Sequence, residues 1–125
     1  MIKVQEFNSA VPFFGQLGLQ DSTGPVYLVF VFNVPADCEA QFLACWKNHG
    51  AVMGRFDGYG SEKLHRGLAH SQVYINYARW QSLAHFGAAF ASPESQACLA
   101  AYPEACTFTG QVLSPVAVEG VCSAD

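Results

Sequence analysis

The amino-acid sequence predicts a single α+β domain, and three observations support that prediction. A chain of 125 residues is long enough for one domain, and with 51% hydrophobic residues it is too apolar to be disordered. Residues 26–34 are almost all β-branched or aromatic, which predicts a buried strand. Helical and strand-like segments follow it in the order β-α-β-β-α-β. That order is typical of a ferredoxin-like unit, which residues 25–119 would form.

Residues 1–24 precede this unit as an irregular arm, and residues 120–125 follow it as a short tail. The arm carries Phe7, Phe13 and Phe14 among Gly, Pro, Ser and Asn residues. Because free tails seldom carry so many large apolar side chains, we expect the arm to cover an apolar surface.

The first helix of the unit is expected to have Asp37 as its N-cap. Inward-facing side chains then recur at steps of three or four, as on one face of a helix: Cys38, Phe42, Cys45, Trp46, His49 and Val52. Residues 50–60 are rich in turn-forming residues and predict a loop.

A hairpin is predicted next, with strands over residues 61–66 and 72–79. Side chains alternate along a strand, so each face of the second strand has its own set. One face carries Tyr74, Asn76, Ala78 and Trp80, and the other carries Val73, Ile75 and Tyr77.

Two short helices and a strand complete the unit. Ser82 is suited to cap the first helix, and Ser92 with Pro93 to open the second. The second helix is expected to stop near Tyr102, because a proline follows and disfavours a helical residue before it. A last strand is predicted over residues 108–118.

The two central strands, residues 26–34 and 72–79, are apolar on both faces. The helices of such a unit cover only one face of its sheet, so the other face needs a second apolar surface. We therefore expect a homodimer in which two copies pack sheet to sheet.

Charge and cysteine content exclude several classes of partner. Six Lys and Arg against ten Asp and Glu give a net charge of −4, which argues against nucleic acid or an anionic membrane as a partner. The five cysteines form no C-x-x-C pair, so a structural zinc site is not expected.

The first residues do not resemble a signal peptide, and no apolar run is long enough for a membrane span. We expect a cytoplasmic protein with reduced thiols.

Residues 75–86 read Ile-Asn-Tyr-Ala-Arg-Trp-Gln-Ser-Leu-Ala-His-Phe and resemble the signature of the antibiotic biosynthesis monooxygenase (ABM) family. In that family an apolar strand ends in Trp-x-Ser and runs directly into a helix. Residues 56–59, Phe-Asp-Gly-Tyr, resemble the family's Pro-Gly-aromatic turn, with Asp57 where proline is usual. Residues 91–94 resemble the break between its paired short helices. The resemblance implies a dimeric α+β barrel with a pocket between the sheet and helices of each subunit.

The quinone-forming oxygenases of this family, which use no cofactor, carry an Asn four residues before the strand-terminal Trp, and Asn76 and Trp80 match that pattern. Two other residues of those enzymes are not kept here. Phe86 stands where they carry a tyrosine, and the position of their later arginine falls near Ala100. The haem-degrading branch has an axial His in the second short helix, where this chain has Leu99, which disfavours haem.

The resemblance thus implies a cofactor-independent monooxygenase that uses molecular oxygen to oxidise an aromatic polyketide-like anthrone or phenol to a quinone. Asn76 would donate its amide to an oxyanion, and Trp80 would offer an indole N–H and a stacking face. His49 on the helix stripe is the candidate base. Apolar contacts to the substrate are expected from Phe30, Phe42, Phe86 and Phe90.

Each of these residues also has a purely structural interpretation. Asn76 would satisfy backbone groups, Trp80 would fill the core and His49 would make a hydrogen bond near the helix end. No metal is expected, because no carboxylate or Cys accompanies the four His at ligand spacing. Two alternative functions therefore remain: a non-catalytic small-molecule-binding or structural protein and, with less support, a haem-degrading monooxygenase.

Overall fold

The computed structural model describes residues 1–19 and 24–124. A five-stranded sheet has the order β1-β5-β2-β4-β3, with bounds β1 Lys3–Gln5, β2 Val26–Asn33, β3 Tyr59–Arg66, β4 Val73–Trp80 and β5 Thr107–Leu113. The helices are α1 Phe13–Gln16, α2 Glu39–Met53, α3 Leu83–Phe90 and α4 Pro93–Ala101, with a 3₁₀ turn, η1, at Ala36–Cys38. From β2 onward this is the predicted β-α-β-β-α-β order.

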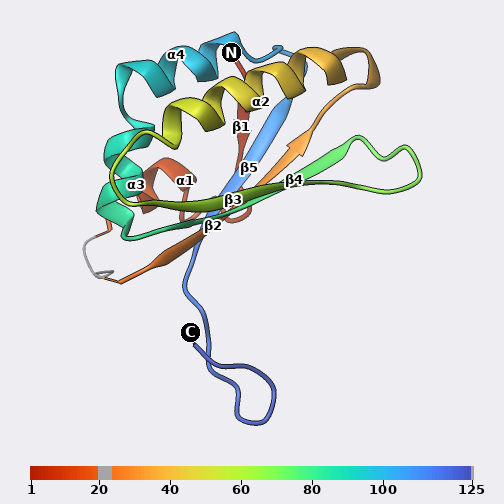
Figure 1. The fold of residues 1–125 in the computed structure, drawn as a ribbon. Helices are drawn as coiled ribbons and strands as arrows, with labels where there is room; N and C mark the ends of the chain where they lie inside the picture. Colours follow the sequence, from red (N-terminus) through yellow and green to blue (C-terminus); the bar gives the residue numbers. More distant parts are fainter. Residues whose placement is uncertain (20–23, 125) are drawn as a thin grey trace.

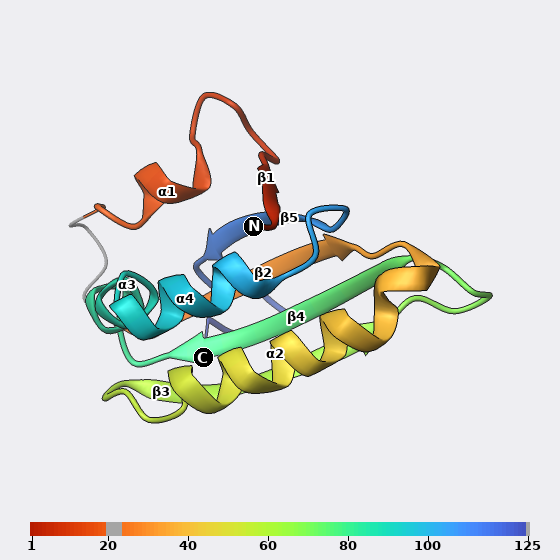
Figure 2. The ribbon, with the colours of Figure 1, turned by 90° about the horizontal axis from the view of Figure 1, so that it is seen from above.

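Helices α2, α3 and α4 lie on one face of the sheet, as Figures 1 and 2 show from two sides. The inward side chains of β2 are buried, whereas its outward side chains before Asn33 are half-buried. In a single chain the outer face of β2 is therefore only partly covered, and full burial would need the second copy that the sequence predicts. On β4 the predicted inward set is confirmed, since Tyr74, Asn76, Ala78 and Trp80 are all buried.

The first long helix differs from the prediction at both ends. Ala36–Cys38 forms a 3₁₀ turn, and Cys38 occupies the N-cap of α2 without a side-chain hydrogen bond, so Asp37 is not the cap. The helix continues through Gly50 to Met53, and β3 begins at Tyr59, so most of residues 50–60 is not a loop. A single Gly weakens a helix by only about 1 kcal/mol, and packing of the apolar face outweighs that.

The two short helices begin where predicted. Ser82 Oγ accepts a hydrogen bond from the His85 backbone N–H at 3.1 Å, and Ser92 Oγ accepts one from Ser95 N–H at 3.2 Å. Helix α4 has Tyr102 as its C-cap. The last strand ends at Leu113, earlier than predicted, so the following segment leaves the sheet.

The N-terminal arm is more ordered than predicted, since β1 pairs in parallel with β5 and α1 packs beside it. Phe13 of α1 is fully buried, with its ring 5.4 Å from that of Phe30 and 6.1 Å from that of Phe108. Gln16 Oε1 accepts a hydrogen bond from Val112 N–H at 2.9 Å. The arm therefore covers apolar side chains of the sheet, as expected. Of its residues, 20–23 lie outside the described part.

Within residues 1–19 and 24–124, no helix has both the length and the apolar character that crossing a bilayer requires.

Candidate active site

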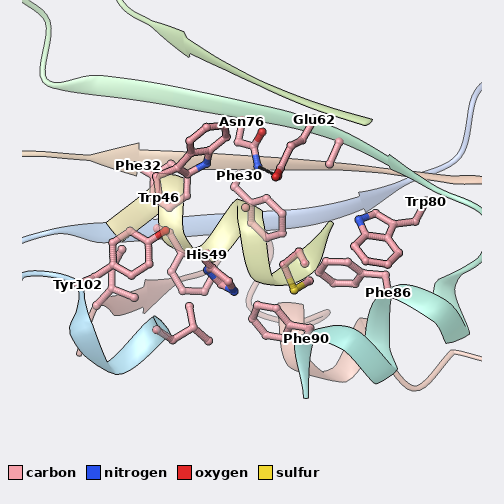
Figure 3. A pocket seen from close by; sticks show the side chains of 16 residues that line it. Phe30, Phe32, Trp46, His49, Glu62, Asn76, Trp80, Phe86, Phe90 and Tyr102 are labelled. Atoms are coloured by element: carbon pink, nitrogen blue, oxygen red, sulfur yellow. Dashed lines mark hydrogen bonds between the residues drawn. The ribbon is translucent and has the colours of Figure 1, made fainter. Parts of the chain in front are cut away.

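A small pocket lies between the inner face of the sheet and helices α2, α3 and α4 (Figure 3). Its cavity has a volume of about 60 Å³. Aromatic and aliphatic side chains form most of the lining, and the polar groups come from Asn76, Glu62, His49, Tyr102 and the Trp80 indole. An apolar pocket with a few polar groups that converge on it is the usual form of a small-molecule site.

Six of the seven predicted site residues line this pocket: Asn76, Trp80, His49, Phe30, Phe86 and Phe90. Phe42 does not. It is fully buried, and its ring packs 5.0 Å from that of Phe32 and 5.7 Å from that of Tyr102. Those two residues line the pocket, so Phe42 supports its wall from behind.

Asn76 and Glu62 form a hydrogen bond between neighbouring strands. Asn76 Nδ2 donates to Glu62 Oε2 at 3.2 Å. Residues that are paired across a sheet point to the same face, and Glu62 pairs with Ala78, so the carboxylate lies diagonally beside Asn76 on the inner face. Burial raises the pKa of Glu62, and the hydrogen bond from Asn76 opposes that rise only in part.

The backbone around Glu62 is shaped by two glycines. The β3–β4 register shifts between Tyr59 and Ser61, and a Cβ at Gly60 would lie only 2.5 Å from the carbonyl oxygen of Arg79. This irregularity lets Tyr59 pair with Trp80 while Glu62 also faces inward. On α2, a Cβ at Gly50 would lie 2.9 Å from Glu62 Oε1, so a larger residue there would shift the carboxylate from its present position.

His49 projects from α2 into the pocket and is tied to α4. Its Nε2 lies 2.8 Å from Ser95 Oγ, and Ser95 is fully buried. Burial lowers the pKa of His49 to about 4. The imidazole is therefore neutral near pH 7 and is a weaker proton acceptor than an exposed histidine.

Trp80 forms the end of the pocket next to α3. The indole makes edge contacts with the rings of Tyr59 and Phe86, each at 5.5 Å between centroids. Figure 3 shows the indole nitrogen on the side of the ring that faces Phe30. Asn76 and Trp80 are four residues apart on one strand face, a separation of about 13 Å along β4.

Leu99 of α4 also lines the pocket. It occupies the position of the axial His in the haem-degrading branch, and its aliphatic side chain cannot ligate iron. The remaining histidines lie elsewhere: His65 on β3, His70 in the β3–β4 turn and His85 on α3, where its Nδ1 is 2.6 Å from Ser82 Oγ. In the described ranges, no three His, Cys, Asp or Glu side chains are gathered as metal ligands.

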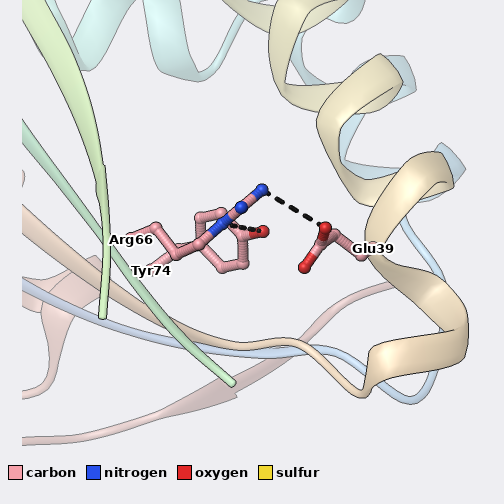
Figure 4. A network of polar contacts seen from close by, with 3 residues as sticks. All are labelled: Glu39, Arg66 and Tyr74. Carbon is pink, nitrogen blue, oxygen red and sulfur yellow. Dashed lines mark hydrogen bonds and ion pairs between the residues drawn. The ribbon is translucent and has the colours of Figure 1, made fainter. Parts of the chain in front are cut away.

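A wider hollow of about 330 Å³ lies at the β3–β4 turn, beside the polar network of Glu39, Arg66 and Tyr74 (Figure 4). Arg66 Nη2 lies 3.2 Å from Glu39 Oε1, and Arg66 Nε donates to Tyr74 Oη at 2.9 Å. Both charged side chains are about half exposed. The guanidinium is thus already paired, and the network joins α2 to the hairpin.

Sequence reasoning missed Glu62 as a site residue, although one signal pointed to it. In the predicted strand 61–66, Glu62 shares a face with Leu64, so a carboxylate occupies an inward position. It also missed Tyr102 and Ile2, which line the pocket from the end of α4 and from the N-terminal arm. No local pattern indicates that the arm reaches this site.

Comparisons with known proteins agree with this architecture. The family model for antibiotic biosynthesis monooxygenase matches residues 25–101. SnoaB, a cofactor-independent oxygenase from Streptomyces nogalater, superposes with a TM-score of 0.70 at 22% identity, over 78% of this chain and 98% of SnoaB. A protein from Shewanella loihica described as a candidate monooxygenase is 30% identical, with a TM-score of 0.62 over 76% of this chain and 97% of its own. No curated protein matches the sequence.

A third similar structure, Rv0793 from Mycobacterium tuberculosis, has a TM-score of 0.65 at 18% identity and covers 77% of this chain and 99% of its own. The N-terminal arm lies outside the residues that the family model matches, whereas most of the pocket lies inside them. The family match covers more than half of the chain and includes the strand-to-helix segment around Trp80. The chain belongs to the antibiotic biosynthesis monooxygenase family.

Proposed function

We propose that the protein is a cofactor-independent monooxygenase that oxidises an anthrone-like or phenolic aromatic substrate to a quinone. The main support for the proposal is the apolar pocket, whose lining combines many aromatic rings with the polar groups of Asn76, Glu62 and the Trp80 indole. SnoaB, whose fold this chain shares, is described as a cofactor-independent oxygenase. Such chemistry needs a substrate that supplies its own electrons once it has lost a proton.

The reaction balances without an added reductant. An anthrone and dioxygen give an anthraquinone and water: the methylene carbon loses two hydrogens and gains one oxygen, and the second oxygen leaves as water. The protein must accept a proton, stabilise the resulting oxyanion and exclude bulk water. Asn76 is suited to an oxyanion at one end of a multi-ring substrate and the Trp80 N–H to an oxygen at the other end, while the rings of Phe30, Phe86 and Phe90 suit its apolar body.

His49 is one candidate for the proton acceptor, as the sequence suggested. Its lowered pKa makes its neutral form available over the whole range above about 4, but also makes that form weakly basic. From the same position in the pocket, neutral His49 could instead hold an oxygen of the substrate by a hydrogen bond.

The small cavity favours a second candidate function. An engineered cavity of roughly 150 Å³ encloses benzene, whereas this cavity measures about 60 Å³. To enclose a ring-sized substrate, the wall of the pocket would have to move. A family member that keeps Trp80 for packing and does not catalyse would need no such movement.

We further propose that the protein forms a homodimer through the sheet face opposite the helices. Tyr27 and Tyr77 stack on that face at 5.7 Å, and Ile75 and Tyr77 are 38% and 46% exposed. The segment after β5 extends beyond the same face in Figure 1, with Val116 and Val121 exposed. Exposed apolar surface of this kind is typical of an interface.

Oxygen consumption tests the activity. With 1,8-dihydroxyanthrone under air and EDTA, we expect protein-dependent uptake of one dioxygen per quinone formed, at a rate unchanged by the chelator. The Asn76→Ala variant should reduce turnover by roughly 10²-fold, as loss of one oxyanion donor does in other enzymes. An absence of uptake above the uncatalysed rate, together with tight binding of the quinone product, would favour the binding protein instead.

A further inference from the structure

The Asn76 amide is bonded at only one of its ends. Its Nδ2 donates to Glu62, while Oδ1 is buried and, among the residues that the structure describes, has no hydrogen-bond partner. Buried polar atoms in proteins are nearly always paired, so an orphan acceptor in a pocket wall is a position for a donor from outside the protein. A substrate hydroxyl is such a donor.

Glu62 determines the orientation of this amide. An ionised carboxylate can only accept hydrogen bonds, so Asn76 must turn Nδ2 toward it and leave Oδ1 for the substrate. A protonated carboxyl can donate instead. The amide can then rotate so that Oδ1 accepts from Glu62 and Nδ2 faces the substrate.

We propose that Glu62 is the proton acceptor of the site and that its protonation state selects which end of the Asn76 amide faces the substrate. This inference rests on the proposed function. Before proton transfer, Oδ1 of Asn76 accepts a hydrogen bond from the neutral substrate hydroxyl. After transfer, Nδ2 donates to the oxyanion. One side chain thereby recognises both the neutral hydroxyl and the anion that replaces it.

The proton transfer is balanced and involves no oxidation. The O–H bond of the phenol or enol breaks, its electron pair stays on the substrate oxygen, and the proton forms an O–H bond with Glu62, directly or through one water. For an anthrone, loss of the enol proton gives the same delocalised anion as loss of a methylene proton. After dioxygen adds to that anion, Glu62 returns the proton to the peroxide oxygen.

The surroundings of Glu62 suit a base. The titratable groups near it are Tyr59 on its own strand, His49 on α2 and Tyr102 after α4. All three are neutral near pH 7, and none of the residues that line the pocket is Lys or Arg. The carboxylate thus has no ion pair to weaken it as a base, and burial raises its pKa.

The Glu62→Gln variant tests this directly, because Gln keeps the size of the side chain and its amide can donate to Asn76 Oδ1. With 1,8-dihydroxyanthrone, we expect kcat/KM to fall by roughly 10²-fold or more and the acidic limb of the pH profile to disappear. Glu104→Gln, which changes an exposed carboxylate, should leave both unchanged. A Glu62→Gln protein that keeps wild-type turnover and an unchanged pH profile would overturn the inference and leave the proposed function intact.

A second measurement does not depend on turnover. The probe 2-hydroxyanthraquinone cannot be oxidised in this way, and its ionisation changes its visible spectrum. Bound to Glu62→Gln at pH 7, a larger fraction of the probe should be ionised than when it is bound to the wild type, because Gln turns Nδ2 of Asn76 toward the probe and places no second negative charge beside it. Equal ionisation in both proteins would overturn the inference. The expected difference without anthrone oxidation would support the control of the Asn76 amide by Glu62 while contradicting the proposed activity.

Discussion

His49 Nε2 and Ser95 Oγ lie 2.8 Å apart, and their hydrogen bond is one of those that join helices α2 and α4 in the wall of the pocket. Because burial lowers the pKa of His49 to about 4 from its usual 6.5, the folded protein takes up a proton there less readily than the unfolded chain. The unfolded state therefore binds more protons between pH 6.5 and 4, and the stability due to His49 is lost as the pH falls through that window.

We expect this loss to be on the order of 3 kcal/mol, and the His49→Gln variant should lack it. Urea unfolding at pH 7 and pH 4.5 measures the difference. The raised pKa of Glu62 acts in the opposite direction, since its contribution to stability falls as the pH rises, but it is common to both proteins. His65→Gln, on an exposed strand position, should behave as wild type. Equal acid sensitivity of wild type and His49→Gln would contradict the prediction.

Trp80→Phe should separate catalysis from packing. Phe keeps an aromatic ring against Tyr59 and Phe86 but removes the N–H, so we expect the free energy of unfolding to change by about 1–2 kcal/mol. If the N–H stabilises an oxyanion, kcat should fall by roughly 10²-fold. Thermal melting and anthrone oxidation give the two values. A variant that melts far lower and turns over normally would identify Trp80 as a core residue.

The close contact between Gly110 and Phe13 should make their substitutions non-additive. A Cβ at Gly110 would lie 2.9 Å from Phe13 Cδ1, so Gly110→Ala should push the arm off the sheet. Phe13→Ala should destabilise by about 3–5 kcal/mol. The double variant should lose less than the sum of the two, because Phe13 is then absent. Urea unfolding of all four proteins measures the coupling, and strict additivity would mean that the two residues act independently.

Ile2 of the arm should limit the size of the ligand. It is 3% exposed and lines a cavity of about 60 Å³, which is less than half the roughly 150 Å³ of an engineered cavity that binds benzene. Ile2→Ala should therefore bind 2-hydroxyanthraquinone several-fold more tightly, as measured by absorbance titration. Phe7→Ala changes an exposed residue of the same arm and serves as the control. Unchanged or weaker binding to Ile2→Ala would show that another part of the wall opens.

The outer sheet face should carry the dimer. Static light scattering of the wild type should give twice the chain mass of 13.5 kDa, and Ile75→Asp should give the mass of one chain. Leu68→Asp, at an 89% exposed residue of the β3–β4 turn, should leave the dimer intact. A wild-type protein that scatters as a single chain at micromolar concentration would overturn this expectation.

The sequence by itself determined the order of the elements from β2 onward, the inner face of β4 and the caps at Ser82 and Ser92. Each of these depends on residues close together in the chain: a period of two along a strand, or a hydroxyl three residues before an N–H. The resemblance around Trp80 identified the family from the same local segment. Phe30, Phe86 and Phe90 were placed at the site because the inner faces of a known fold converge there.

Only the tertiary structure decided which residues meet at the pocket. The hydrogen bond between Glu62 and Asn76 joins two strands, and the arm brings Ile2 to a pocket that is otherwise lined by much later residues. No local periodicity predicts either contact. Phe42 has the same helical spacing as His49, yet the packing of Phe32 and Tyr102 leaves it behind the wall. The physical reason is that periodicity specifies which face of an element is buried, whereas strand register and side-chain packing specify which buried atoms touch.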